Sequence, residues 1–370
     1  MINKKRMVDE FLELVSIDSV SRKERRMADT LKAELKTMGY EVAEDDAGEK
    51  IGGDTGNLIC TVKGTKPVPA VMLTAHMDTV EPGRGKKPIV DGEYIRTDGT
   101  TVLGGDDVSG IVCVLEALKV LRENGLQHGD IQIVFTVAEE VGLLGSKNLD
   151  LSKIYAKYGI VLDGDGAIGS IAVKAPSQYK MNVAVKGKAA HAGVSPEKGI
   201  SAIQMAAAAI SGMKLGRIDF ETTANIGAIN GGRETNIVCE RVDIKAEDRS
   251  RDKLKLEKQK EHMRECFEKA AAEFGGNVEF KAELEYPSYS IPKDAKIIGI
   301  LKKAADAAGI ELLPEETGGG SDTNIFNSKG IQAVDISVGM DKVHTVEERI
   351  LVDDMVRAAE FLVSIILNIE

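Results

Sequence analysis

The 370-residue sequence predicts an α/β protein in which a domain with a mostly parallel sheet is interrupted by an inserted ferredoxin-like α+β domain. Two observations support this fold class. Apolar strands alternate with amphipathic helices over residues 1–176 and again over 288–370, as in parallel sheets that are covered by helices. Residues 177–287 instead follow the order strand, helix, strand, strand, helix, strand, which is typical of a ferredoxin-like unit. We therefore expect one discontinuous domain and one inserted domain.

The N-terminal part of the discontinuous domain is expected to begin with two helices. Apolar residues recur at helical spacing over 4–15 and 23–38, and Gly39 is suited to a helix C-cap. Short apolar strands and one apolar helix follow. The expected strands are 41–43, 57–62, 70–74, 131–137 and 160–162, and the expected helix is 111–121.

The pattern changes at about Ser177, where polar and apolar residues alternate as in a half-exposed antiparallel strand. The elements expected in the inserted domain are strands at 179–186, 223–228, 236–246 and 278–285 and helices at 200–213 and 252–274. Residues 286–292 are expected to lead back to the first domain. The elements expected there are a helix at 294–308, a strand at 333–338 and a C-terminal helix at 353–367.

Composition limits the classes of function. The formal net charge of −11 argues against binding to nucleic acids or anionic membranes, because such binding needs basic patches. The four cysteines form no Cys-x-x-Cys motif and are expected to be reduced. The N-terminus has no apolar signal core, and the apolar run at 361–367 is too short to span a bilayer. We therefore expect a cytoplasmic protein that binds small substrates or metal ions.

Acidic and imidazole side chains gather at the predicted strand ends and in one glycine-flanked loop. They are His76, Asp78, Asp106, Glu139, Glu140, Asp163 and His344. In open α/β sheets, ligands bind at the carboxyl ends of the strands, so we expect these side chains to converge. Two adjacent buried glutamates are costly without a nearby cation, which favours a metal site.

Two imidazoles and several carboxylates without a thiol suit zinc, manganese or cobalt in a hydrolytic site. A short carboxylate in a tight glycine loop, such as Asp106, is suited to bridging two ions. Asp78 lies close enough in sequence to accept the second ring N–H of His76. Of Glu139 and Glu140, one can bind metal while the other takes a proton from the attacking water.

The order of these motifs resembles the dinuclear zinc family that includes peptidase T, carboxypeptidase G, aminoacylase and succinyl-diaminopimelate desuccinylase. The motifs are His-x-Asp at 76–78, Gly-Gly-Asp-Asp-x-x-Gly at 104–110, Ala-Glu-Glu-x-Gly at 138–142, an Asp at 163 and a late His at 344. Each motif alone is weak, but five in the same order are specific. The resemblance covers essentially the whole chain and is strongest to peptidase T.

The resemblance implies two zinc ions per chain, with Mn²⁺ or Co²⁺ as alternatives. The implied ligands are His76 and Asp163 for one ion, Glu140 and His344 for the other, and Asp106 as the bridge. Asp165 competes with Asp163, and we prefer Asp163 because it directly follows the predicted strand. The resemblance also implies a cis peptide bond after Asp106. The family often has Lys two residues after the bridging Asp, whereas this chain has Val108.

The resemblance also implies catalytic and substrate-binding roles. Glu139 would be the general base that generates a metal-bridging hydroxide, and Asp78 would support the metal histidine. In the inserted lid domain, His191 would reach across a homodimer to polarise the scissile carbonyl. The candidates for holding the polar ends of the substrate are Asn236, Arg249, Gly319 and Gly320, the glycines through backbone N–H groups.

Together these observations predict a metallohydrolase that cleaves an amide bond in small peptides, similar to a peptidase T that acts as an aminopeptidase on di- or tripeptides. An N-acyl amino acid deacylase or a carboxypeptidase of the same fold is the first alternative, because metal ligands act on the bond and not on its flanks. A non-catalytic peptide-binding homologue is the second. An intact Glu139 argues against it, since such a homologue has no reason to keep a costly buried base.

Overall fold

The computed structural model describes residues 1–370, which form two compact units. The first unit contains Met1–Val173, Ser290–Glu316 and Ser321–Glu370, and the second contains Lys174–Tyr289 together with Thr317–Gly320. The chain thus leaves the first unit, forms the second and returns. The division expected from the sequence differs by a few residues at each boundary, and it had kept residues 317–320 in the first domain.

The first unit is built on a mixed sheet of order β1-β2-β6-β3-β7-β16-β17-β5-β4, and β8 pairs with β16 beside this path. The four central strands are parallel: β6 (Ile131–Thr136), β3 (Val71–His76), β7 (Tyr158–Asp165) and β16 (Gln332–Asp341). The other strands are β1 (Val42–Glu44), β2 (Leu58–Val62), β4 (Ile89–Asp91), β5 (Tyr94–Arg96), β8 (Ser170–Ala175), β14 (Tyr289–Ser290), β15 (Leu313–Glu316) and β17 (Arg349–Leu351). The predicted α/β class is confirmed, with the parallel pairing concentrated in the centre of the sheet.

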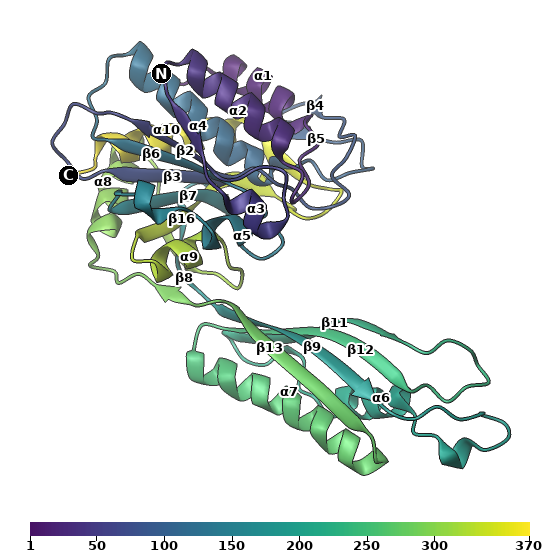
Figure 1. Ribbon diagram of the computed structural model, residues 1–370. Coiled ribbons are helices and arrows are strands. Elements are labelled where there is room, and N and C mark those ends of the chain that lie inside the picture. Colours follow the sequence, from purple (N-terminus) through teal and green to yellow (C-terminus); the bar gives the residue numbers. More distant parts are fainter. The chain divides into compact units, whose positions relative to one another are not determined.

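Helices cover both faces of this sheet. The long helix α4 (Gly105–Glu123) packs on β3, β7 and β16, and α1 (Lys4–Val15) and α10 (Val352–Leu367) pack on α4. Figure 1 shows these three on one face, whereas α9 (Asp322–Ser328) packs on the other. The remaining helices are α2 (Arg25–Thr37), α3 (Ala47–Ile51), α5 (Leu144–Lys147), α8 (Lys296–Ala308) and the 3-10 turn Leu151–Lys153. Because both faces are covered, every residue of β3 and β6 is buried.

Two departures from the sequence-based expectation affect the site or its surroundings. The strand predicted at 160–162 extends to Asp165, because Gly164 pairs with Ser337 of β16 even though the apolar run has ended. The β4-β5 hairpin was not expected, since β4 is exposed along its length and contributes no apolar run.

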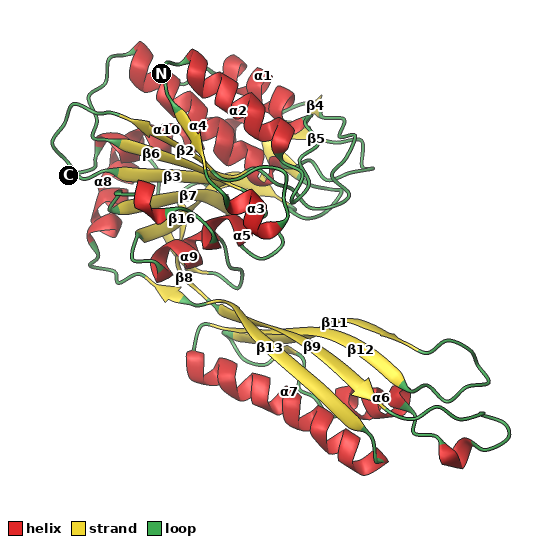
Figure 2. Cartoon of the chain, in the orientation of Figure 1, coloured by secondary structure: helices red, strands yellow, loops and turns green.

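The second unit is a five-stranded antiparallel sheet of order β10-β11-β12-β9-β13. Its strands are β9 (Ser177–Lys186), β10 (Gly216–Arg217), β11 (Thr222–Gly231), β12 (Arg241–Ser250) and β13 (Asn277–Tyr286). The helices α6 (Ala202–Ser211) and α7 (Lys253–Phe274) lie on one face, as Figure 2 shows, and a 3-10 turn spans Pro196–Lys198. This arrangement confirms the predicted ferredoxin-like unit. The strand predicted at 236–246 begins only at Arg241, so residues 236–240 form a loop.

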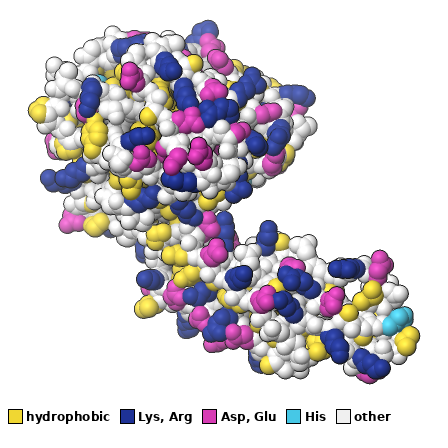
Figure 3. Space-filling model, in the orientation of Figure 1, with side chains coloured by type: hydrophobic (Ala, Val, Ile, Leu, Met, Phe, Trp, Pro, Cys, Tyr) yellow, Lys and Arg dark blue, Asp and Glu magenta, His cyan; other side chains and the backbone are white.

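Alternating burial along β12 explains how the second unit forms a core with a single layer of helices. Val242, Ile244 and Ala246 are buried against the helices, and the residues between them are exposed. On the face of the molecule shown in Figure 3, basic and acidic side chains are interspersed. No helix combines the length and the apolar character that crossing a membrane requires.

Candidate functional site

The polar side chains predicted at the strand ends come together at one edge of the central parallel strands. Their donor atoms fall within 4.8 Å of one another in two overlapping groups, His76-Asp106-Glu140 and His76-Asp107-Asp163. His76 is the last residue of β3, Asp163 lies near the end of β7, and Glu140 follows β6. Parallel pairing places these strand ends side by side, which is why distant motifs meet.

Asp106 lies between the two imidazoles of the cluster. Its Oδ1 is 2.9 Å from Nε2 of His76, and its Oδ2 is 3.1 Å from Nε2 of His344. The two oxygens of one short carboxylate therefore face two different donor groups, as a bridging ligand must. The peptide bond from Asp106 to Asp107 is cis, as the family resemblance implies.

Each half of the cluster has a further carboxylate. Oε2 of Glu140 is 3.0 Å from Nε2 of His344, and Oδ1 of Asp163 is 3.5 Å from Nε2 of His76. Asp165 is exposed and belongs to neither donor group. The geometry therefore favours Asp163 over Asp165, although both lie within β7 rather than after it.

The backbone around the cluster is held by buried carboxylates that accept N–H groups of the candidate ligands. Asp107 accepts the N–H of His76 at 3.1 Å, and Asp335 accepts that of Asp163 at 3.2 Å. Glu348 accepts the N–H of Asp106 at 3.0 Å. These outer carboxylates fix the direction in which each ligand points.

Asp78 belongs to the same outer set, with a geometry that differs from the one expected. The ring Nδ1 of His76 is 2.8 Å from the backbone carbonyl oxygen of Asp78 and 3.5 Å from its carboxylate. The carboxylate instead accepts the N–H of Glu139 at 2.9 Å and the hydroxyl of Ser21 at 2.6 Å. It therefore acts mainly on the Glu139 backbone, because the chain turns after β3 and presents its carbonyl to the ring.

Electrostatics in the cluster favour added positive charge. Burial, followed by repulsion from Asp163, raises the pKa of Glu139 well above its usual range. Hydrogen bonds that His344 donates to Asp106 and Glu140 raise its pKa to about 10. Burial opposes the charged form of His76, yet contacts with Asp106, Asp163 and Asp78 still raise its pKa well above normal.

This oxygen and nitrogen donor set, with two imidazoles and no thiolate, fits two divalent ions of the zinc, manganese or cobalt type. The crowding of buried carboxylates supports the same fit, because such groups are costly without a cation.

The sequence analysis missed three members of the outer set. Asp107 was visible only as the neighbour of Asp106, and Asp335 was hidden within a strand predicted as core. Glu348 follows His344 by four residues and had no pattern of its own. A polar residue inside an apolar strand, as at Asp335, is the one sequence signal that could have indicated an outer carboxylate.

The residues predicted in the second unit are less tightly organised. His191 is exposed, and its Nδ1 accepts the N–H of Gly193 at 3.2 Å. Asn236 is exposed and accepts the N–H of Ala192 through its carbonyl. Arg249 is paired with Glu247 at 3.0 Å, so its guanidinium is already partly engaged.

The two candidate glycines also lie in the second unit. The N–H of Gly319 donates to Oγ1 of Thr317 at 3.0 Å, so it is used within the turn. A Cβ on Gly320 would lie 2.4 Å from the Tyr286 ring, which explains why this segment packs with the second unit. The helix that follows has seven residues and begins at Asp322.

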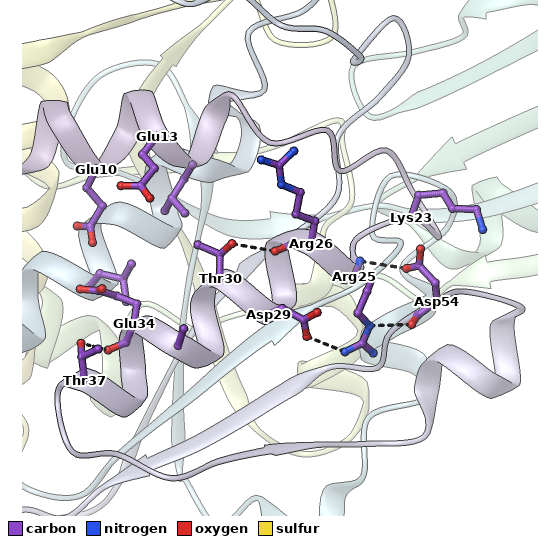
Figure 4. A pocket seen from close by; sticks show the side chains of 13 residues that line it. Glu10, Glu13, Lys23, Arg25, Arg26, Asp29, Thr30, Glu34, Thr37 and Asp54 are labelled. Atoms are coloured by element: carbon purple, nitrogen blue, oxygen red, sulfur yellow. Dashed lines mark hydrogen bonds and ion pairs between the residues drawn. The ribbon is translucent and has the colours of Figure 1, made fainter.

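A separate hollow of about 760 Å³ lies between α1 and α2 and contains none of the predicted site residues. Figure 4 shows hydrogen bonds of Arg25 to Asp29 and Asp54, and of the Thr30 and Thr37 hydroxyls to nearby backbone carbonyls. Arg25, for example, donates to Asp29 at 3.0 Å and to the carbonyl of Asp54 at 3.1 Å. The hollow therefore lacks the convergent reactive groups of the cluster.

Comparison with known proteins agrees with this site. Residues 72–368 match the model of peptidase family M20/M25/M40. Protein YqjE of Bacillus subtilis is 48% identical over 99% of both chains. The crystal structure of aminopeptidase PepT from Bacillus cereus is 46% identical, covers 100% of this chain and 99% of its own, and superposes with a TM-score of 0.89. A tripeptidase from Staphylococcus aureus is 41% identical over 99% and 98% of the chains, with a TM-score of 0.94. This chain belongs to peptidase family M20/M25/M40 and is a metallopeptidase similar to peptidase T.

Proposed function

We propose that the protein is an aminopeptidase that hydrolyses di- or tripeptides with two zinc ions per chain. The observation that carries this proposal is the placement of Asp106 between His76 and His344, with the buried Glu139 alongside. The similarity to an aminopeptidase PepT and to a tripeptidase supports the substrate class.

The ligand set of the proposed centre follows from the contacts in the cluster. The ligands would be His76 and Asp163 for one ion, Glu140 and His344 for the other, and Asp106 between them. Zinc is our first choice because two imidazoles are present, and manganese or cobalt would fit the same donors. When bound, such ions would lower the pKa of a water molecule and polarise the scissile carbonyl.

Glu139 is the proposed general base. Its carboxyl is buried, and its backbone N–H is held by Asp78 at 2.9 Å, so its position is fixed before substrate arrives. A glutamate whose pKa is raised holds a proton more readily than a solvated one, which suits it to take a proton from the attacking water. The same carboxyl then delivers that proton to the leaving amine.

The second unit would supply substrate contacts. His191 is an exposed imidazole that would polarise the carbonyl of a substrate, within one chain or across a homodimer. Asn236, Arg249, Gly319 and Gly320 would hold the polar ends of a short peptide. We further propose that the protein is a homodimer formed through this unit and that it works in the cytoplasm, without binding nucleic acids or membranes, in keeping with its net charge of −11.

A matched pair of substrates tests the proposal. The zinc-reconstituted protein is given one tripeptide with a free N-terminus and the same tripeptide with an N-acetyl group, and both rates of hydrolysis are measured. Faster cleavage of the free tripeptide supports the aminopeptidase. Faster cleavage of the acetylated form would instead identify a deacylase or carboxypeptidase, and cleavage of neither across a panel of peptides would point to a non-catalytic binding protein.

A further inference from the structure

A buried carboxylate outside the ligand set, that of Glu348, joins two segments that carry ligand candidates. Its Oε2 accepts the N–H of Gly104 at 2.8 Å, and its Oε1 accepts the N–H of Asp106 at 3.0 Å. Glu348 is only 2% exposed and lies four residues after His344. One side chain therefore connects the His344 loop to the turn that presents Asp106, although the bonded residues Glu348 and Gly104 are 244 positions apart.

The turn is shaped to receive this carboxylate at close range. Gly104 has a φ of +74°, a conformation that favours glycine. A Cβ on Gly105 would lie 3.1 Å from Oε1 of Glu348, so a larger residue there would push the carboxylate away. The approach of Glu348 thus explains Gly105, whereas Gly104 is explained by its backbone conformation.

A buried ammonium group lies on the same turn. Nζ of Lys86 would be 3.1 Å from a Cβ on Gly104, and it has no hydrogen-bond partner although Lys86 is only 6% exposed. The acidic groups whose charges act on it are Asp18 and Glu348. Burial lowers the pKa of the Lys86 ammonium to about 8, against the weaker attraction of these two carboxylates.

We propose that Glu348 is a positioning residue that holds the backbone of Asp106 at a fixed place relative to His344. The inference rests on the proposed dinuclear centre and goes beyond it, because Glu348 accepts backbone N–H groups and is not one of the proposed ligands. Asp106 must face His76 and His344 at once, and sites of this kind tolerate displacements of only about 0.5 Å. Loss of the two hydrogen bonds that Glu348 accepts, which we call the tether, should therefore weaken metal binding before it disturbs the fold.

The test is zinc affinity, measured by competition with a chromophoric chelator at a temperature where circular dichroism shows all variants folded. Glu348→Gln keeps the size of the side chain but turns an amide N–H₂ toward one of two backbone donors. We expect zinc to bind about 10- to 100-fold more weakly, with activity recovering as zinc is raised. Glu347→Gln is the matched control, because Glu347 is 69% exposed and pairs only with Lys342 on the surface. It should bind zinc like the unaltered protein.

The outcomes separate this inference from the proposed function. If the unaltered protein binds two zinc ions and Glu348→Gln binds them equally tightly, the positioning role is wrong and the metal centre stands. If the unaltered protein does not bind two ions, the proposed function is wrong, and the positioning role of Glu348 is wrong as well. If Glu348→Gln does not fold, Gly105→Ala decides, since it displaces the carboxylate by a few tenths of an ångström without removing its charge. Weaker zinc binding supports the tether, and unchanged binding overturns it.

Discussion

Asp248 in the second unit should make the stability of the protein depend on pH. This residue is 0% exposed, lies in β12 between Ala224 and Tyr179 of the neighbouring strands, and neither carboxylate oxygen has a hydrogen-bond partner. Burial raises its pKa from 3.8 to about 7, against a weaker opposing attraction from Lys260. The folded state therefore keeps the proton to higher pH than the unfolded state, so the free energy of unfolding falls as pH rises from about 4 to 7.

The replacement Asp248→Asn removes this titration while keeping the shape of the side chain. At about 1.4 kcal/mol per pKa unit, the full difference corresponds to an upper bound of about 4 kcal/mol. The quantity to compare is the free energy of unfolding of the variant minus that of the unaltered protein. We expect this difference to be larger at pH 7 than at pH 5 by about 2–3 kcal/mol. The assay is urea denaturation at both pH values, combined with amide hydrogen exchange of β12 and α7 to localise the change.

The matched control is Asp243→Asn on the same strand. Asp243 is exposed and pairs with Arg241, and this contact lowers its pKa, so it is ionised in both states throughout this pH range. Its replacement should change the free energy of unfolding only slightly, and equally at both pH values. An effect of Asp248→Asn that is the same at pH 5 and pH 7 would refute the reasoning.

Three further predictions concern the ligands, the outer carboxylates and the core. Asp163→Asn should lose most of one equivalent of zinc by metal analysis, whereas Asp165→Asn should keep both; the reverse pattern would exchange their roles. Asp78→Asn should lower kcat at saturating zinc by at least about tenfold, because it disturbs the Glu139 backbone. Ser21→Ala should have a smaller effect. Equal rates for Asp78→Asn and the unaltered protein would contradict the role of Asp78 in holding that backbone. Phe267→Ala should lower the free energy of unfolding by about 3–5 kcal/mol in urea, because its ring is buried in the second core; a loss under 1 kcal/mol would show that this core can collapse around the cavity.

The fold was largely accessible from sequence because its signals are local. Alternation along β12 and the buried run of β6 each follow from a few consecutive residues. The extension of β7 to Asp165 was not accessible, because its last residues are held by β16 and not by their own apolar character. The membership of residues 317–320 in the second unit likewise depends on packing against Tyr286.

In the candidate site, too, residues with a local sequence signal were predicted and residues that depend on distant contacts were not. Ligand candidates such as His76 and Glu140 could be predicted because strand ends of a parallel sheet converge wherever the sheet forms. The outer carboxylates could not, because each acts through a backbone N–H that carries no sequence signature. Glu348 and Gly104 are far apart in the chain, and only the folded structure brings them together. For the same reason, the partner of the Asp78 carboxylate was predicted to be a ring and is mainly a backbone N–H.

The most direct test of the central claim is to measure metal content and turnover together in Glu139→Gln. Because Glu139 is placed beside the ligands and not among them, we predict two bound zinc ions per chain and a rate of tripeptide hydrolysis that is lower by about 10²- to 10⁴-fold. Retained turnover with both ions bound would contradict its role as the base, and loss of zinc from the variant would show that Glu139 is itself a ligand.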